Sequence, residues 1–174
     1  MSGAGDLQVV EFGLGSEVFA VPVTLVREIL DYAQPSHLPK GPPHFVGLTD
    51  VRGQGVPTVD MRRRLGLPAV EPTLATRILI LDVPLPDRVL TLGVVIDRVL
   101  SVTSFGRTDI EAAPDIGVRW DSRYITGVVR RDTAFVVIVD AARIFTAEDA
   151  IGIGSDSNHA GPDTDKRVSL QGGK

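Results

Sequence analysis

Two acid–arginine pairs occur with the same spacing in different parts of the sequence. Asp60 precedes Arg63 by three residues, and Asp140 precedes Arg143 in the same way, each time where a strand-like run meets a helical turn. A carboxylate at such a join can accept hydrogen bonds from the free N–H groups of the turn. An arginine one turn later can pair with it. We therefore expect both pairs to cap helices and not to perform acid–base catalysis.

The other residues that could do chemistry form no active-site pattern. His37 and His44 lie seven residues apart in a proline-rich segment, so they lack the i, i+4 spacing of a helical metal pair and are expected to be solvated. The sequence contains no cysteine, and it lacks phosphate-binding loops, nucleophile elbows and zinc-protease motifs. We expect no enzyme, no metal and no cofactor, and favour a binding module.

Arg52 is a permanent charge inside an apolar run, followed by a turn at residues 53–55. Such a turn would expose the side chain, whose planar fork of donors suits a carboxylate on a partner helix. The alternative is an intramolecular clamp with Asp50 or Asp60. The residues alone favour neither interpretation.

The composition limits the class of protein. The chain has 174 residues, of which 43% are hydrophobic and 23% charged, so it can bury a core. A formal net charge of −4, with only 5% aromatic residues, disfavours nucleic-acid binding. We expect neither a signal peptide nor direct membrane insertion, since no apolar run reaches about 18 residues.

Short apolar runs separated by Gly and Pro predict a mainly β fold, as a sandwich or barrels, with a few helical turns. Residues 9–15 and 17–23 alternate as in a hairpin. Residues 23–30 have helical spacing and predict a helix, and residues 61–67 and 141–145 predict helical turns. Further strands are expected at residues 45–51, 55–60, 76–83, 89–96, 123–129 and 134–140.

The chain also repeats itself. Residues 45–65 match residues 125–145 at an offset of 80, and residues 19–23 match residues 92–96 at an offset of 73. The sequence therefore contains two copies of a unit about the size of one barrel. We expect a flexible arm over residues 1–8, one barrel over 9–73, a second over 74–146 with strand exchange between them left open, and a disordered tail over 147–174.

The ordered series of segments resembles the CheW-like family of chemotaxis adaptors, over residues 9–146. The segments that carry the resemblance are FGLGSEVFAVPVTLVREIL, LPKGPPHFVGLTDVRGQGVPTVDMRRRLG, LTLGVVIDRVLSV, AAPDIGVRWDSRYITGVV and FVVIVDAARIF. The sequence departs from the family pattern at Asp50, where asparagine is usual, and at Met61, where leucine is usual. Asp50 adds a negative charge beside Arg52.

The resemblance implies two SH3-like five-stranded β-barrels packed side by side, with short helices. It implies a non-enzymatic adaptor that joins the cytoplasmic tip of methyl-accepting chemoreceptors to the regulatory domain of a CheA-type histidine kinase. Such a protein would be cytoplasmic and would reach membrane receptor arrays through its partners. The alternatives are an adaptor of a chemosensory system that controls pili or second messengers, and, in another class, a small β-barrel ligand-binding protein.

The resemblance also assigns site residues. Kinase binding is expected at Val26 and Glu28, and receptor binding at Arg52, Gly47, Gly93, Val99, Val102 and Gly127. The residues themselves leave other roles open: a solvated surface for Glu28, core packing for Val26, and backbone geometry for the glycines.

Overall fold

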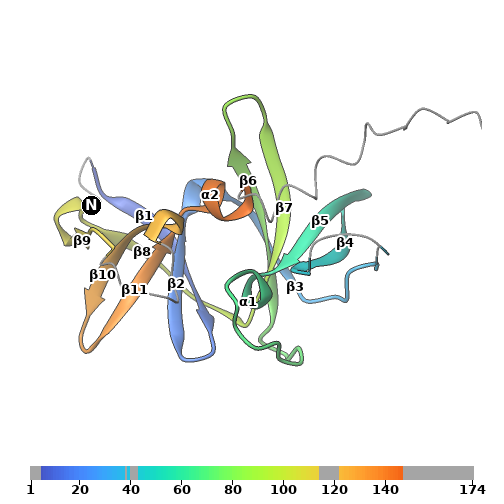
Figure 1. The fold of residues 1–174 in the computed structure, drawn as a ribbon, viewed down its shortest axis with the longest axis horizontal. Coiled ribbons are helices and arrows are strands. Elements are labelled where there is room, and N and C mark those ends of the chain that lie inside the picture. The colour runs from blue at the N-terminus through green and yellow to red at the C-terminus, as the bar shows by residue number, and fades with distance from the viewer. Residues whose placement is uncertain (1–4, 38, 40–42, 114–121, 147–174) are drawn as a thin grey trace, which may run out of the picture.

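The computed structural model describes residues 5–37, 39, 43–113 and 122–146. These residues form a mainly β molecule of two curled sheets that lie side by side (Figure 1). The six-stranded sheet, here called the split barrel, has the order β8 (Arg98–Phe105), β1 (Leu7–Leu14), β2 (Glu17–Pro22), β11 (Ala134–Val139), β10 (Ile125–Arg131), β9 (Ile110–Glu111). The five-stranded sheet, the inserted barrel, has the order β3 (Val26–Asp31), β6 (Arg77–Pro84), β7 (Val89–Ile96), β5 (Gln54–Asp60), β4 (Phe45–Val51).

The strand order confirms the internal repeat. In both barrels a hairpin, β1–β2 or β6–β7, pairs on one side with an edge strand, β8 or β3, and on the other in parallel with β11 or β5. The predicted SH3-like pair of barrels is thereby confirmed, although the split barrel has a sixth strand, the two-residue β9.

The two barrels do not coincide with the consecutive halves 9–73 and 74–146. Hairpin β1–β2 joins strands from the C-terminal half, and hairpin β6–β7 joins strands from the N-terminal half. The inserted barrel is therefore continuous in sequence, from β3 to β7, while the split barrel is assembled from both sides of it. Strand exchange, which the sequence left open, is the arrangement found.

The helix predicted over residues 23–30 is wrong. A single 3-10 turn, η1 (Val23–Leu25), leads into strand β3, which pairs antiparallel with β6. Burial alternates along β3, with Val26 half-buried and Ile29 exposed. A strand here supplies the backbone partner that β6 needs, and the β-branched residues of the segment suit it.

Both other predicted helical turns are confirmed, as α1 (Met61–Arg64) and α2 (Ala141–Thr146). They lie near the junction of the barrels (Figure 1). There the Arg64 guanidinium donates to the carbonyl of Ile144 at 2.8 Å. Two further 3-10 turns are η2 (Arg107–Asp109) and η4 (Ser122–Tyr124). Strand β1 begins at Leu7, inside the arm predicted over residues 1–8, of which residues 1–4 lie outside the described residues. The tail at 147–174 lies outside the described residues.

Three apolar clusters hold the fold together. One fills the split barrel around Val9 and Ile138, and one fills the inserted barrel around Ile78 and Ile80. The largest lies where the barrels meet, with Phe12 and Phe19 of one packing toward residues such as Leu79 of the other. Because the outer faces of both sheets are buried against each other, the two barrels share this largest cluster, and each has a smaller cluster of its own.

His44, expected to be solvated, is only 6% exposed. Its carbonyl accepts a hydrogen bond from the Asp60 N–H at 2.8 Å, which draws the end of the proline-rich loop against β5. Among the described residues no helix is long and apolar enough to cross a membrane.

Candidate functional site

Arg52 lies at the turn between β4 and β5, in a left-handed backbone conformation with φ 52°. Its side chain is 83% exposed, and its Nη2 lies 3.0 Å from Oε1 of Glu28 on β3. Asp50 is engaged differently, since its Oδ1 accepts the N–H of Gly53 at 2.9 Å. The intramolecular partner of Arg52 is thus Glu28 and neither of the two aspartates considered. An exposed pair of this kind contributes about 0–1 kcal/mol, so the guanidinium can exchange it for another carboxylate.

Strand β3 carries the residues expected to bind the kinase. Glu28 is partly exposed, and the neighbouring Ile29 exposes 43% of its surface, while Val26 packs against the cluster between the barrels. Arg27 is held by Asp82 of β6 at 2.8 Å. Glu28 and Arg52, expected to serve different partners, therefore lie together on one surface of the inserted barrel.

Strand β8 carries Val99 and Val102, whose side chains have different surroundings in the structure. Val99 packs against the cluster between the barrels, whereas Val102 is 65% exposed. Leu100, which sequence reasoning missed, is also exposed, at 43%. It is the extra residue of a β-bulge, because Glu11 pairs with Ser101 and the next residue of β1 pairs with Val99. A bulge turns a side chain outward and leaves no pattern in the sequence.

The three glycines expected at the receptor site are buried. A Cβ at Gly93 would lie 2.8 Å from Oγ1 of Thr58, and one at Gly127 would lie 2.6 Å from Cγ2 of Ile110. At Gly47, where φ is 138°, a Cβ would overlap the carbonyl of Ser36. These positions allow close approach of neighbouring strands, so their influence on a partner would be indirect.

Both acid–arginine pairs cap helices, as their spacing predicted. Oδ1 of Asp60 accepts the N–H of Arg62 at 2.9 Å, and Oδ1 of Asp140 accepts the N–H of Arg143 at 3.1 Å. The arginine–carboxylate distances of 3.6 Å for Arg63–Asp60 and 3.7 Å for Arg143–Asp140 add weak ion pairs.

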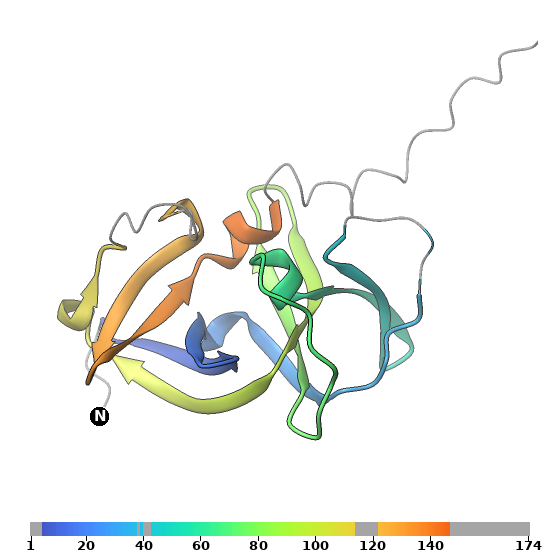
Figure 2. The ribbon, with the colours of Figure 1, turned by 60° about the horizontal axis from the view of Figure 1, so that its bottom comes forward.

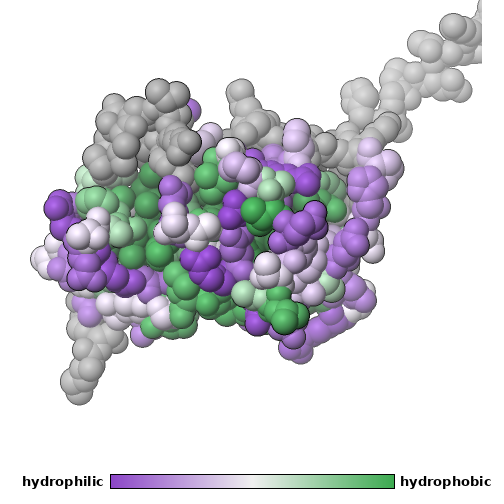
Figure 3. Space-filling model, turned by 90° about the horizontal axis from the view of Figure 1, so that it is seen from below, coloured by the Kyte–Doolittle hydropathy of each residue, from purple (hydrophilic) through white to green (hydrophobic). Residues whose placement is uncertain are grey.

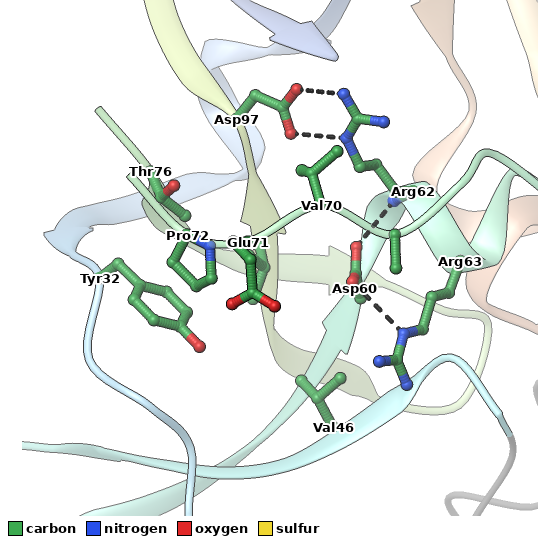
Figure 4. Close-up of a pocket in the computed structure, with 12 residues that line it drawn as sticks. Tyr32, Val46, Asp60, Arg62, Arg63, Val70, Glu71, Pro72, Thr76 and Asp97 are labelled. Carbon is green, nitrogen blue, oxygen red and sulfur yellow. Dashed lines mark hydrogen bonds and ion pairs between the residues drawn. The ribbon is translucent and has the colours of Figure 1, made fainter. Parts of the chain in front are cut away.

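A cavity of about 340 Å³ opens at one end of the inserted barrel (Figure 4). On its rim Arg62 holds Asp97 through two hydrogen bonds, of 2.8 and 2.6 Å, and the N–H of Gly15 donates to the same carboxylate at 2.7 Å. The Arg62 hydrogen bonds, more than burial or the Gly15 N–H, set the pKa of Asp97, which lies below its ordinary value. These groups neutralise one another and tie the barrels together. The cavity is lined by Tyr32, Val46, Asp60, Arg62, Arg63, Ala69, Val70, Glu71, Pro72, Thr76, Val95 and Asp97.

Sequence reasoning also missed a buried carboxylate. Glu11 of β1 is 1% exposed, and its carboxylate accepts hydrogen bonds from Ser101 and Thr103 and pairs with Arg131. Burial raises the pKa of Glu11, but these hydrogen bonds and the charge of Arg131 together outweigh it and hold the pKa below its ordinary value. The only signal in the sequence is one acid within the run VVEFGL.

The face seen in Figure 3 has apolar side chains in its middle and polar ones toward both ends. Among the described residues, the edge strands β3 and β8 each expose a large apolar residue at matching places of the repeat, Ile29 and Val102. Exposed apolar groups framed by polar ones are typical of protein-binding surfaces.

Comparison with known proteins identifies the family to which the chain is similar. The family model of the CheW-like domain matches residues 8–149. "Chemotaxis protein CheW" of Bacillus subtilis is 30% identical over 81% of this chain and 88% of its own length. "Chemotaxis protein CheW" of Rhizobium meliloti is 28% identical over 83% of this chain and 91% of its own length. The crystal structure of the scaffolding protein TtCheW from Thermoanaerobacter tengcongensis has the same fold, with a TM-score of 0.72 and 21% identity, over 82% of this chain and 90% of that one.

Proposed function

The chain belongs to the CheW-like family, and we propose that it is a non-enzymatic adaptor that couples methyl-accepting chemoreceptors to a CheA-type histidine kinase in a chemosensory array. The family is one of scaffolds, which accords with the absence of catalytic motifs from the sequence. The adaptor would lie beside the membrane because its partners hold it there.

The observation that carries the proposal is the pair of exposed edge strands. A protein that bridges two partners needs two surfaces, and β3 and β8 each present an apolar side chain to solvent from a different barrel. A long receptor helix would make apolar contacts with Leu100 and Val102, and the kinase would contact Glu28 and Ile29. Arg52 would meet a carboxylate of the receptor.

The test is a pull-down from lysate of the source cells, with mass spectrometry of the recovered proteins. The baits are the wild type, Arg52→Glu, Glu28→Arg and the double variant with both changes. We expect the wild type to recover a chemoreceptor and a CheA-type kinase, and Arg52→Glu to lose the receptor. The double variant restores an internal ion pair with its charges reversed.

The double variant separates the two roles of Arg52. If Arg52 contacts the receptor directly, the double variant stays deficient. Recovery of the receptor by the double variant would show that Arg52 acts only as an internal clamp. If the wild type recovers neither partner, the adaptor proposal fails. The identity of the recovered kinase distinguishes a flagellar system from one that controls pili or second messengers.

A further inference from the structure

We propose that the buried Glu11–Arg131 ion pair is a positioning device that fixes the exposed edge of β8 for partner binding. The inference rests on the proposed function, since it assigns β8 a partner. It concerns a cluster inside the split barrel, none of whose members is itself expected to touch receptor or kinase, although two of them flank Val102.

The cluster holds β8 on both sides of Val102. The hydroxyls of Ser101 and Thr103 donate to Oε2 of Glu11 at 2.5 and 2.7 Å, respectively. Because successive side chains of a strand point to opposite faces, tying these two residues inward directs Val102 outward, where it is 65% exposed. The carboxylate therefore determines which face of β8 meets solvent.

Strand β8 is an edge strand, held by backbone pairing on one side only. Among the described strands it pairs only with β1, and the bulge at Leu100 interrupts that ladder next to Ser101. A bulge bends its strand and increases the local twist, so side-chain contacts next to it help to set which way the strand faces. Figure 2 shows β8, in yellow-green, running along the lower side of the molecule from one barrel into the other.

Arg131 anchors the carboxylate from the opposite side of the barrel. It lies at the end of β10, which is not a neighbour of β8 or β1 in the sheet, and its Nη1 is 2.6 Å from Oε1 of Glu11. Its guanidinium also lies over the ring of Phe105, 5.7 Å from the centroid. One carboxylate thus links three strands, of which β8 carries the exposed apolar residues.

The inserted barrel folds without this cluster. The place of Glu11 is taken there by Ile80, which pairs across to Gly93 as Glu11 pairs to Ala20. The place of Arg131, 80 residues earlier, is taken by Val51, and both replacements belong to the apolar core of that barrel. Barrel architecture alone therefore does not require a buried charge, and apolar replacement of a buried ion pair is often neutral or stabilising.

The repeat supplies the test variant. Glu11→Ile with Arg131→Val gives the split barrel the apolar pair that the inserted barrel already uses. A second variant, Ser101→Ala with Thr103→Val, removes the two hydroxyl contacts and leaves the ion pair in place. Two measurements are made on the full chain: amide hydrogen exchange across β8 compared with β6–β7, and affinity for the purified cytoplasmic fragment of the chemoreceptor that the wild type recovers.

We expect both variants to melt within a few degrees of the wild type. Exchange over β8 should become about tenfold faster and receptor affinity about tenfold weaker, the scale of one or two lost hydrogen bonds. Exchange in β6–β7 and kinase binding should stay unchanged, because the cluster contacts neither.

The proposal is overturned if a folded variant keeps the exchange rate of β8 and the receptor affinity of the wild type. If the variant Glu11→Ile with Arg131→Val does not fold, the variant Ser101→Ala with Thr103→Val alone tests the proposal, by the exchange of β8 and the receptor affinity. Should the wild type fail to bind the receptor fragment, the adaptor function fails by itself, while the exchange of β8 still decides whether the cluster positions that strand.

Discussion

Gly47 is the residue at which the backbone constraint is tightest. Its φ of 138° disfavours any side chain, and a Cβ would overlap the Ser36 carbonyl, which accepts the Leu48 N–H at 2.9 Å. We expect Gly47→Ala to destabilise the fold by about 2–4 kcal/mol. Gly53→Ala is the matched control, since φ is 84° there but a Cβ would meet nothing within 4 Å. Its cost should be about 1 kcal/mol.

Urea unfolding of both alanine variants measures this difference. Equal losses at the two positions would mean that backbone strain alone, and not the approach of Ser36, requires glycine at position 47. A loss at Gly47 with unchanged receptor affinity per folded molecule would assign this glycine to packing.

The lowered pKa of Glu11 predicts a loss of stability in acid. A carboxyl whose pKa is lower in the folded state stabilises it at pH values above its ordinary pKa of about 4.5, and that contribution is lost as the pH falls through the lowered value. We expect the difference in unfolding free energy between wild type and Glu11→Gln to be constant near neutral pH and to shrink below about pH 4.5. Urea titrations at several pH values measure it, and a difference independent of pH would contradict the ionised state of Glu11.

At the residue scale, spacing in the sequence predicted the roles of residues whose partners lie nearby in the chain. Asp60 and Asp140 cap the helices that follow them because the partners of a cap are two or three residues away. Glu11 and His44 were missed or misjudged because their burial depends on distant strands. The Ser101 and Thr103 hydroxyls that donate to Glu11 lie 90 and 92 residues further along the chain.

The short helix α1 depends on its cap. It has four residues, and the hydrogen bond from the Arg62 N–H to Asp60 satisfies one of its free donors. We expect Asp60→Ala to destabilise the protein by about 1 kcal/mol and Asp60→Asn, which can still cap, by less than half of that. Thermal melts of the two variants make the comparison. Equal losses would mean that the charge, through Arg63, and not the cap, supplies the stabilisation.

Hairpins and helical turns were the elements that the sequence predicted well, because alternation and the turn residues between strands are local signals. Strand β3 was mistaken for a helix because Val26, Ile29 and Leu30 happen to fit helical spacing. What decides its state is β6, whose open edge lies about 50 residues further along the chain and pairs Ile29 with Leu79. A segment of ambiguous periodicity takes the structure that its neighbour requires.

At the scale of the whole molecule, the barrels are coupled by exchange of hairpins. The sequence revealed the repeat but not the exchange, because a hairpin that matches its counterpart can pair equally well within its own half or across it. The parallel pairings β2–β11 and β5–β7 decide between the two, and both join residues far apart in sequence.

Division of the chain between residues 73 and 74 therefore removes a hairpin from each barrel. We expect the separate pieces 1–73 and 74–174 to remain unfolded, because each lacks strands central to both sheets. Mixing them should restore a cooperative thermal transition, as seen by circular dichroism. A cooperative transition in either piece alone would show that the strands can pair within one half.

The continuity of the inserted barrel has a consequence for synthesis on the ribosome. All strands of this barrel have been made once β7 is complete, whereas hairpin β1–β2 is finished at Pro22 and meets β11 only from Ala134 onward. At about 5–20 residues per second, the face of the hairpin that carries Val9 and Ala20 stays uncovered on the order of ten seconds until β11 is made. A hairpin made before the inserted barrel is thus enclosed after it, and it is the segment on which a chaperone would act.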